Sequence, residues 1–321
     1  MLGRVMELRD TLLREETRRK LVSWWRGVDD EPALHPLVSE PQGIPGDAAP
    51  AARPSPSCSV VHRIAVAEHL WGRGNIGPGD SDFIRELGVQ LGLNKEKTLG
   101  FLGIGLAGAA RALVTDSEVW VTAFEANPEI AKAANEQNML AGMAKKITVT
   151  ACPFDTLALP ARKFNDIIAK DVFARVENKD ALCEQIAGSL KPGGSFLFAE
   201  YVAPGGMLTP EDCETYFCKD FGPVYPLADG QSRTLVQAHG LDLRVEENVT
   251  SRYAEYATAG WANLRGILDR LSEATGEGPE RFAIMRAVAD EASIWANRID
   301  AFRNGKLAVY RYLAMSPSGP A

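Results

Sequence analysis

The chain has 321 residues, of which 45% are hydrophobic and 24% charged, and its formal net charge is −7. This composition is typical of a globular protein with one large domain or two ordinary ones. The negative charge argues against nucleic acid as a partner, because affinity for nucleic acid depends on a basic surface that neutralises phosphates.

The cysteine pattern and the lack of long apolar runs bear on the compartment. Five cysteines lie at irregular spacings without a Cys-x-x-Cys pair, which indicates neither a disulfide framework nor a metal site. No apolar run reaches the roughly 18 residues of a membrane span, and the N-terminus carries charges where a signal peptide would be apolar. We therefore expect a cytoplasmic protein with reduced thiols and no bound metal.

Residues 1–28 place apolar side chains at helical intervals with arginines between them, and Trp24 and Trp25 lie near the end. The pattern predicts an amphipathic helix. It could lie on a membrane surface with its tryptophans at headgroup level. We favour a helix docked on its own domain or on the second subunit of a homodimer, because four acids in the segment weaken any attraction to lipid.

Residues 29–59 contain seven prolines among alanine, serine and glycine, and they predict a linker. Helical spacing begins at Val60 (VVHRIAVAEHLWG) and ends at a glycine-rich loop, residues 72–80 (GRGNIGPGD). Such a loop could fold over a ligand as a lid, or could merely join two helices, and the sequence leaves both readings open.

Strand and helix patterns alternate from residue 82 onward and predict one domain over residues 60–321. Strands are expected at 99–102, 119–125, 147–151, 166–169, 195–201, 241–249 and 307–314, and helices at 82–91, 128–139, 180–190, 230–239, 253–273 and 279–303. This alternation predicts an α/β fold, a Rossmann-like three-layer sandwich around a mostly parallel seven-stranded sheet.

The helical pair between the last two strands, at about residues 251–305, reads as an inserted lid. It carries four large aromatic residues: Tyr253, Tyr256, Trp261 and Trp295. They could line a substrate pocket, although aromatics at helical spacing more often belong to the core, which is the reading we favour.

Residues 99–108 (LGFLGIGLAG) predict a strand, a glycine turn with Gly103, Gly105 and Gly108, and the start of a helix. Glycines let the backbone turn sharply and approach a ligand, and the free N–H groups of the helix start favour polar ligand atoms. Glu125 ends the next strand, where a carboxylate can accept both hydroxyls of a ribose. The local motif suits a dinucleotide or an adenosyl cofactor.

The segment SLKPGGSFLFAEY (189–201) resembles the one that leads into the fifth strand of class I S-adenosylmethionine-dependent methyltransferases. FLGIGLAG likewise resembles the first motif of that superfamily, AFEANPE its ribose-binding acid, CPFDTLALP its adenine-contacting segment and FNDIIAKDVFARV its fourth strand with the following loop. The resemblance covers about residues 64–315 and implies S-adenosylmethionine as the cofactor.

The resemblance also implies roles for individual residues. Gly103 and Gly105, in the turn that Gly108 completes, would line the methionine part of the cofactor, and Glu125 would hold the ribose. The adenine would contact Phe154 and Asp155, and the reacting centre would face Asp171. The chain looks nearest to the group of phosphoethanolamine N-methyltransferases and quinone C-methyltransferases, which implies a small-molecule or lipid-like acceptor.

Three positions depart from the family pattern. Phe101 stands where the first motif usually has an acid that meets the amino group of the cofactor. Ala67 and Arg175 stand where the phosphoethanolamine enzymes have a paired tyrosine and histidine, so phosphoethanolamine is a doubtful substrate.

Methyl transfer from a sulfonium is an in-line displacement that depends on positioning, and a protonated nucleophile also needs a base. Asp171, His69 and Glu200 are candidate bases, and Arg175 could clamp an anionic group of the acceptor. Each has an ordinary alternative as a helix cap or a surface residue. The leading hypothesis is methyl transfer; the alternatives are a lapsed methyltransferase that binds a metabolite or a partner, and an NAD(P)-dependent enzyme.

Overall fold

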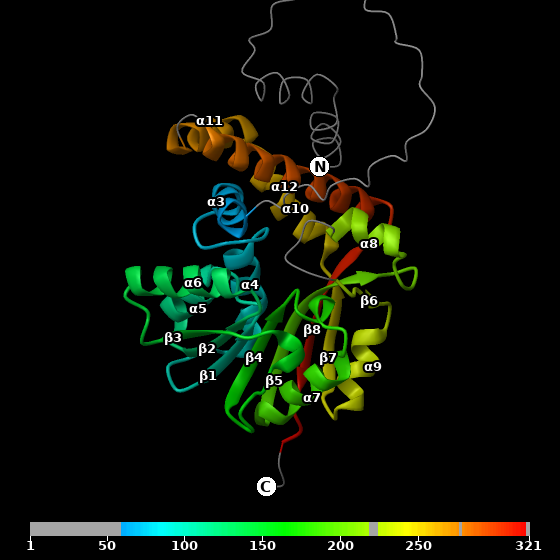
Figure 1. Cartoon of the computed structure of the whole chain (residues 1–321). Helices are drawn as coiled ribbons and strands as arrows, with labels where there is room; N and C mark the ends of the chain where they lie inside the picture. Colours follow the sequence, from blue (N-terminus) through cyan, green and yellow to red (C-terminus); the bar gives the residue numbers. More distant parts are fainter. Residues whose placement is uncertain (1–58, 218–223, 276–277, 319–321) are drawn as a thin grey trace, which may run out of the picture.

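The structure is a computed structural model that describes residues 59–217, 224–275 and 278–318. In this part of the chain a mostly parallel sheet lies between helices on both faces, and a further group of helices covers one end of it (Figure 1). The predicted Rossmann-like three-layer α/β fold is therefore confirmed. The helix predicted at residues 1–28 and nearly all of the predicted linker lie outside the described residues.

The sheet has the seven predicted strands on its main path, in the order β3-β2-β1-β4-β5-β8-β7. Its strands are β1 (Thr98–Leu102), β2 (Trp120–Glu125), β3 (Ile147–Ala151), β4 (Phe164–Lys170), β5 (Leu190–Ala203), β6 (Leu227–Ala228), β7 (Asp242–Asn248) and β8 (Ala308–Met315). Strands β1 to β5 run parallel, and β8 runs antiparallel between β5 and β7. The two-residue β6, which pairs with β5, was not predicted because it is too short to show a periodic pattern.

The described helices follow the predicted positions with two differences. They are α3 (Val60–Trp71), α4 (Asp80–Gly88), α5 (Gly108–Ser117), α6 (Pro128–Leu140), α7 (Lys179–Ser189), α8 (Pro210–Phe217), α9 (Gln231–Ala238), α10 (Thr250–Trp261), α11 (Leu264–Thr275) and α12 (Pro279–Arg303). Helix α8 was not predicted. The single helix predicted at 253–273 is two helices, because the Asn263 side chain accepts the N–H of Gly266 and thereby caps a new helix, α11. In the described ranges, no helix combines the length and apolarity that crossing a bilayer requires.

Alternating side chains of β1 divide the core between the two faces of the sheet. Leu99 and Phe101 pack in a cluster with Phe83 of α4, while Leu102 belongs to the opposite cluster with Ile186 of α7. Both faces of β1 are thus covered by protein. A ligand therefore meets this strand beyond its carboxyl end, as in other open α/β sheets.

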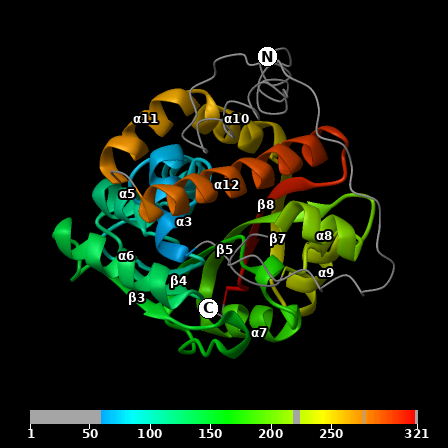
Figure 2. The ribbon, with the colours of Figure 1, turned by 45° about the horizontal axis from the view of Figure 1, so that its top comes forward.

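Helices α3, α10, α11 and α12 gather over that end of the sheet, and we call them the helical cap (Figure 2). Three tryptophans join them: the Trp71 ring lies 6.2 Å from that of Trp261 and 5.2 Å from that of Trp295, centroid to centroid. A side chain at Gly260 would collide with Trp71. The insertion predicted at 251–305 therefore packs against α3, which comes from the other end of the described chain.

We expect Gly103→Ala to destabilise the fold more than Gly142→Ala does. Both glycines have a φ of 70°, so the left-handed backbone penalises alanine equally, by about 1–2 kcal/mol. A Cβ at Gly103 would also lie 2.5 Å from the carbonyl oxygen of Lys170, whereas Gly142 has nothing within 4 Å. Urea unfolding of both variants measures the difference, and equal losses would show that the turn yields to a side chain.

Candidate functional site

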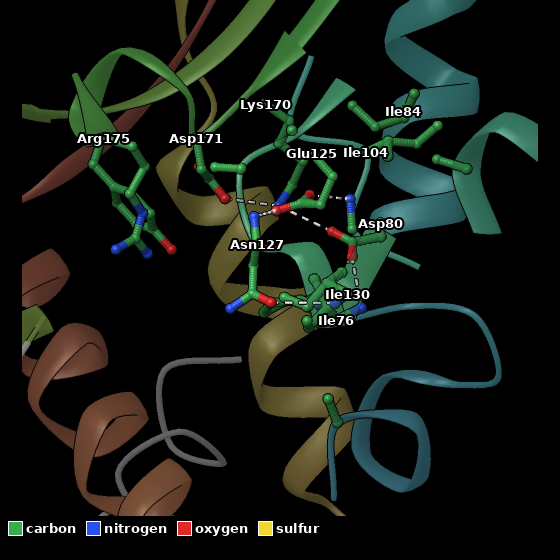
Figure 3. Close-up of a pocket in the computed structure, with 18 of the residues that line it drawn as sticks. Ile76, Asp80, Ile84, Ile104, Glu125, Asn127, Ile130, Lys170, Asp171 and Arg175 are labelled. Carbon is green, nitrogen blue, oxygen red and sulfur yellow. Dashed lines mark hydrogen bonds and ion pairs between the residues drawn. The ribbon is translucent and has the colours of Figure 1, made fainter. Parts of the chain in front are cut away.

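A cavity of about 280 Å³ lies between the helical cap and the carboxyl ends of β1, β2 and β4 (Figure 3). Its lining comes from the glycine turn, the segments after β2, β3 and β4, the loop before α4, and the cap helices. Of the predicted site residues, the cavity is lined by Gly103, Gly105, Glu125, Phe154, Asp155, Asp171 and Arg175. The topology thus brings most of the predicted site to one place.

The glycine turn leads from β1 into α5 and forms one wall of the cavity. Gly103 and Gly105 both have left-handed backbones, with φ of 70° and 56°. Gly108 does not line the cavity: its N–H donates to the carbonyl of Gly74 at 2.9 Å, where a Cβ would meet that oxygen at 2.5 Å. Gly108 therefore lets the loop before α4 approach the turn.

That loop, residues 72–80, lies over the glycine turn and borders the cavity through Ile76, Gly77 and Pro78. A side chain at Gly105 would come within 2.8 Å of Ile76, which shows how closely the loop approaches the turn. The loop does more than join two helices, because part of the cavity wall is made from it.

Glu125 ends β2 with its carboxylate at the cavity and is only 8% exposed. One carboxylate oxygen accepts the N–H of Gly105 at 2.9 Å, and the other accepts the N–H of Asn127 at 3.1 Å. Burial raises the pKa of Glu125, while these N–H donors and the charge of Arg175 oppose the rise. A carboxylate oxygen can accept more than one hydrogen bond, so the group can also accept hydroxyls of a ligand.

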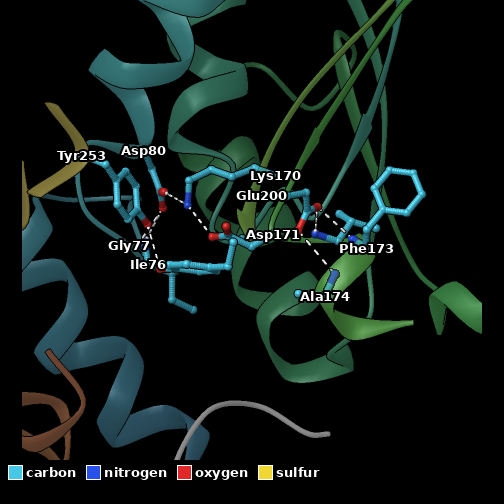
Figure 4. A network of polar contacts seen from close by, with 12 residues as sticks. Ile76, Gly77, Asp80, Lys170, Asp171, Phe173, Ala174, Glu200 and Tyr253 are labelled. Atoms are coloured by element: carbon cyan, nitrogen blue, oxygen red, sulfur yellow. Dashed lines mark hydrogen bonds and ion pairs between the residues drawn. The ribbon is translucent and has the colours of Figure 1, made fainter. Parts of the chain in front are cut away.

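A buried lysine to which the sequence analysis gave no role lies at the same end of the sheet. Lys170 is the last residue of β4, and its Nζ lies 2.9 Å from Oδ1 of Asp80 and 2.8 Å from Oδ2 of Asp171 (Figure 4). Burial opposes the charge of Lys170, but the carboxylates of Asp171 and Asp80 outweigh it and raise its pKa well above the usual value. A charged residue at the end of the apolar strand FNDIIAK is the signal that could have identified it.

One end of the cavity lies under the helical cap. Two of the four aromatics of the insertion, Tyr253 and Trp295, line it, whereas Tyr256 and Trp261 do not. Arg63 of α3 also borders it, with its Nε donating to Glu291 of α12 at 2.9 Å. All four aromatics belong to the apolar core or pack against it, as we favoured, and two of them also face the cavity.

His69, a predicted base, lies outside the cavity lining. It is on α3, and its Nδ1 is 2.9 Å from the carbonyl oxygen of Ala65, one turn earlier in the same helix. The helical repeat turns His69 away from the face that carries Arg63 and Ala67 to the cavity.

Glu200 is likewise outside the cavity lining and has no exposed surface. Its carboxylate accepts the N–H groups of Val172, Phe173 and Ala174 at 2.6, 2.8 and 3.3 Å, so it holds the turn after β4 in place (Figure 4). Burial and then the negative charge of Asp171 raise the pKa of Glu200 to about 8. Glu200, which the sequence analysis named as a candidate base, is thus buried and positions the segment that follows Asp171.

We expect Glu200 to make the fold less stable as pH rises from about 5 to about 8. In this window the unfolded chain carries an ionised Glu200 while the folded chain keeps it protonated, so unfolding releases a proton and stability falls with pH, by at most about 1.4 kcal/mol per pH unit. Urea unfolding across this range should show the free energy of the wild type falling relative to Glu200→Gln. Glu184 is exposed, so the difference in unfolding free energy between the wild type and Glu184→Gln should not change with pH. If the difference between the wild type and Glu200→Gln does not change with pH either, the expectation is contradicted.

Two comparisons by sequence relate this chain to methyltransferases. Residues 102–198, which run from the end of β1 into β5, match the methyltransferase domain family by sequence. Over 151 residues, 47% of this chain, the sequence is 24% identical to phosphoethanolamine N-methyltransferase of Triticum aestivum. The match covers 30% of that relative, so this chain corresponds to about a third of its length.

Solved structures show the same fold at low sequence identity. Phosphoethanolamine N-methyltransferase 2 of Haemonchus contortus, in complex with phosphomonomethylethanolamine and S-adenosylhomocysteine, is similar at a TM-score of 0.68 and 18% identity, over 79% of this chain and 57% of that one. The [4+2]-cyclase SpnF is similar at a TM-score of 0.60 and 17% identity, over 84% of this chain and 100% of that one. Residues 102–198 are thus similar in sequence to the methyltransferase domain family, and the described part of the chain has a fold that solved S-adenosylmethionine-binding methyltransferases also have.

Proposed function

We propose that this protein binds S-adenosylmethionine in the cavity and transfers its methyl group to a small-molecule or lipid-like acceptor. The observation that carries the proposal is that Gly103, Glu125 and Phe154 border one cavity, where the resemblance assigns them to the methionine, ribose and adenine parts. The matched methyltransferase domain, residues 102–198, contains all three. The cytoplasm, expected from the cysteine pattern, is the compartment we propose.

The residues present fit the adenosine part of this cofactor. Glu125 is held in place at the cavity by the N–H groups of Gly105 and Asn127, and its carboxylate oxygens can accept further hydrogen bonds, which suits the hydroxyls of a ribose. Phe154 offers a buried ring and Asp155 a carboxylate beside it, as an adenine ring with an exocyclic amine requires. The bound cofactor would supply an electrophilic methyl group.

We propose that the acceptor occupies the end of the cavity under the helical cap. The cap excludes water and can hold a nucleophile near the methyl carbon, which supplies much of the rate in a displacement. There Arg175 would clamp an anionic group, and Asp171 would take a proton where the nucleophile carries one.

Phosphoethanolamine is not the acceptor we propose, although a relative with this fold binds phosphomonomethylethanolamine. Ala67 and Arg175, which stand in place of the expected tyrosine and histidine, both border the cavity here. Neither residue can reproduce a phenol or an imidazole, so a different set of groups must recognise the acceptor.

A second candidate is cofactor binding without methyl transfer, and Phe101 favours it. Its side chain is 1% exposed and borders the cavity where the superfamily usually has a carboxylate. SpnF, a protein of the same fold, is a [4+2]-cyclase, so the fold also serves a different reaction.

Calorimetry should show binding of S-adenosylhomocysteine and not of NAD⁺, and Glu125→Gln should weaken that binding by about 10-fold to 100-fold. The loss follows from replacing a charged acceptor of two hydroxyls with a neutral one. Glu129→Gln, exposed on the first turn of α6, is the matched control and should leave the affinity unchanged. No binding by the wild type, or tighter binding of NAD⁺, would contradict the proposal.

Transfer of a labelled methyl group distinguishes the two candidates. We expect the protein to move the label from S-adenosylmethionine into small molecules of a cell extract in a single turnover, detected by mass spectrometry. Asp171→Asn should slow this transfer at least about 10-fold, because it removes a base next to the reacting centre. Cofactor binding with no transferred label would favour the second candidate.

A further inference from the structure

The amino-acid end of the cofactor poses a problem for this cavity. It carries one ammonium and one carboxylate, and either charge is costly to bury without a partner. Phe101, in the usual place of the carboxylate that meets the ammonium, offers only carbon atoms. Other groups at the carboxyl end of β1 must therefore supply both a negative and a positive partner.

Lys170 is in the right position to supply the positive partner. In the parallel pairing of β1 with β4, Leu102 lies opposite Ala169, so Gly103 and Lys170 are the next residues along the two strands. The Lys170 side chain is 9% exposed and borders the cavity, and its ammonium lies between Asp80 and Asp171. It is charged at neutral pH, because the two carboxylates outweigh the cost of burial.

Asp80 offers the negative partner. Its Oδ2 accepts the N–H groups of Ile76 and Gly77 at 2.9 and 2.8 Å, which fixes the carboxylate at the cavity wall. Its Oδ1 is buried, lies 2.9 Å from Lys170 Nζ in an ion pair, and accepts no hydrogen bond within the described residues (Figure 4). An ammonium group of a ligand would satisfy this oxygen.

We propose that Lys170 and Asp80 form the subsite for the amino-acid end of the adenosyl cofactor, Lys170 taking its carboxylate and Asp80 its ammonium. This inference rests on the proposed function. A zwitterion that enters between Lys170 and Asp80 exchanges one ion pair for two and leaves no buried charge without a partner. Asp171 keeps its contact with Lys170 and positions the ammonium.

The test compares three adenosyl thioethers by calorimetry: S-adenosylhomocysteine, its analogue without the carboxylate (S-adenosyl-3-thiopropylamine), and 5′-methylthioadenosine, which lacks both charges. The wild type should bind the first at least about 10-fold more tightly than the second, because the carboxylate meets a buried ammonium. Lys170→Met should bind these two with equal affinity. Its affinity for 5′-methylthioadenosine should equal that of the wild type, which reports on folding and on the adenosine end.

Lys179→Met is the matched control. Lys179 is also buried, but its Nζ donates to the carbonyl of Val176 and it does not line the cavity. This variant should keep the preference of the wild type for the carboxylate. If Lys170→Met also keeps that preference, or binds S-adenosylhomocysteine more tightly than the wild type does, the subsite is wrong.

Two further measurements keep the proposal testable if Lys170→Met does not fold. Asp80→Asn should weaken binding of S-adenosyl-3-thiopropylamine at least about 10-fold, with 5′-methylthioadenosine unchanged, since only the former carries an ammonium. The wild type also tests the proposal without any variant: if it binds all three adenosyl thioethers with equal affinity, the proposed subsite is wrong. If it binds none of them, the proposed function fails and the subsite with it.

Discussion

The site depends on how closely the backbones of β1 and β4 approach each other at their carboxyl ends. Gly103 leaves β1 with a left-handed backbone, and no Cβ fits between it and the carbonyl of Lys170. This contact sets the direction of the glycine turn, which in turn presents the N–H of Gly105 to Glu125. A larger residue at 103 would push apart the two strands that hold opposite walls of the cavity.

Polar groups in and around the cavity are paired across elements far apart in the sequence. Lys170 of β4 meets Asp80 of α4, Arg63 of α3 meets Glu291 of α12, and Glu200 of β5 holds the N–H groups after β4. Removing one member would leave its partner buried without compensation, which costs more than the pair itself contributes. The polar groups are therefore oriented before any ligand arrives, and a ligand has little ordering of side chains to offset.

The sequence was informative where local patterns decide the structure. Apolar strands, the glycines of residues 99–108 and the acid at 125 predicted the sheet and one wall of the cavity, because period and spacing are local properties. The wall under the helical cap depends on tertiary contacts. Which of the cap aromatics border the cavity is decided by packing of α10 and α12 against α3, and no helical pattern encodes that packing.

For Lys170 and Glu200, too, the local sequence does not reveal which side chain borders the cavity. Both ionisable groups are at the ends of parallel strands, where functional groups are expected, yet Lys170 lines the cavity and Glu200 is enclosed behind it. His69 was misjudged because a helix places neighbouring residues on different faces, and its rotation relative to the sheet follows from the packing of Trp71. The loop before α4 could be assigned to the cavity only after its contact with Gly108 was seen.

The Arg63–Glu291 pair has a consequence for how the protein is made. These residues are separated by 228 positions in the sequence, and both line the cavity between the sheet and the helical cap. During synthesis, β1 to β5 emerge long before α12, so the wall that carries the glycine turn and Glu125 is exposed to water until the last part of the chain arrives. A nascent chain that stops before residue 279 would therefore lack the part of the cavity wall that α12 supplies.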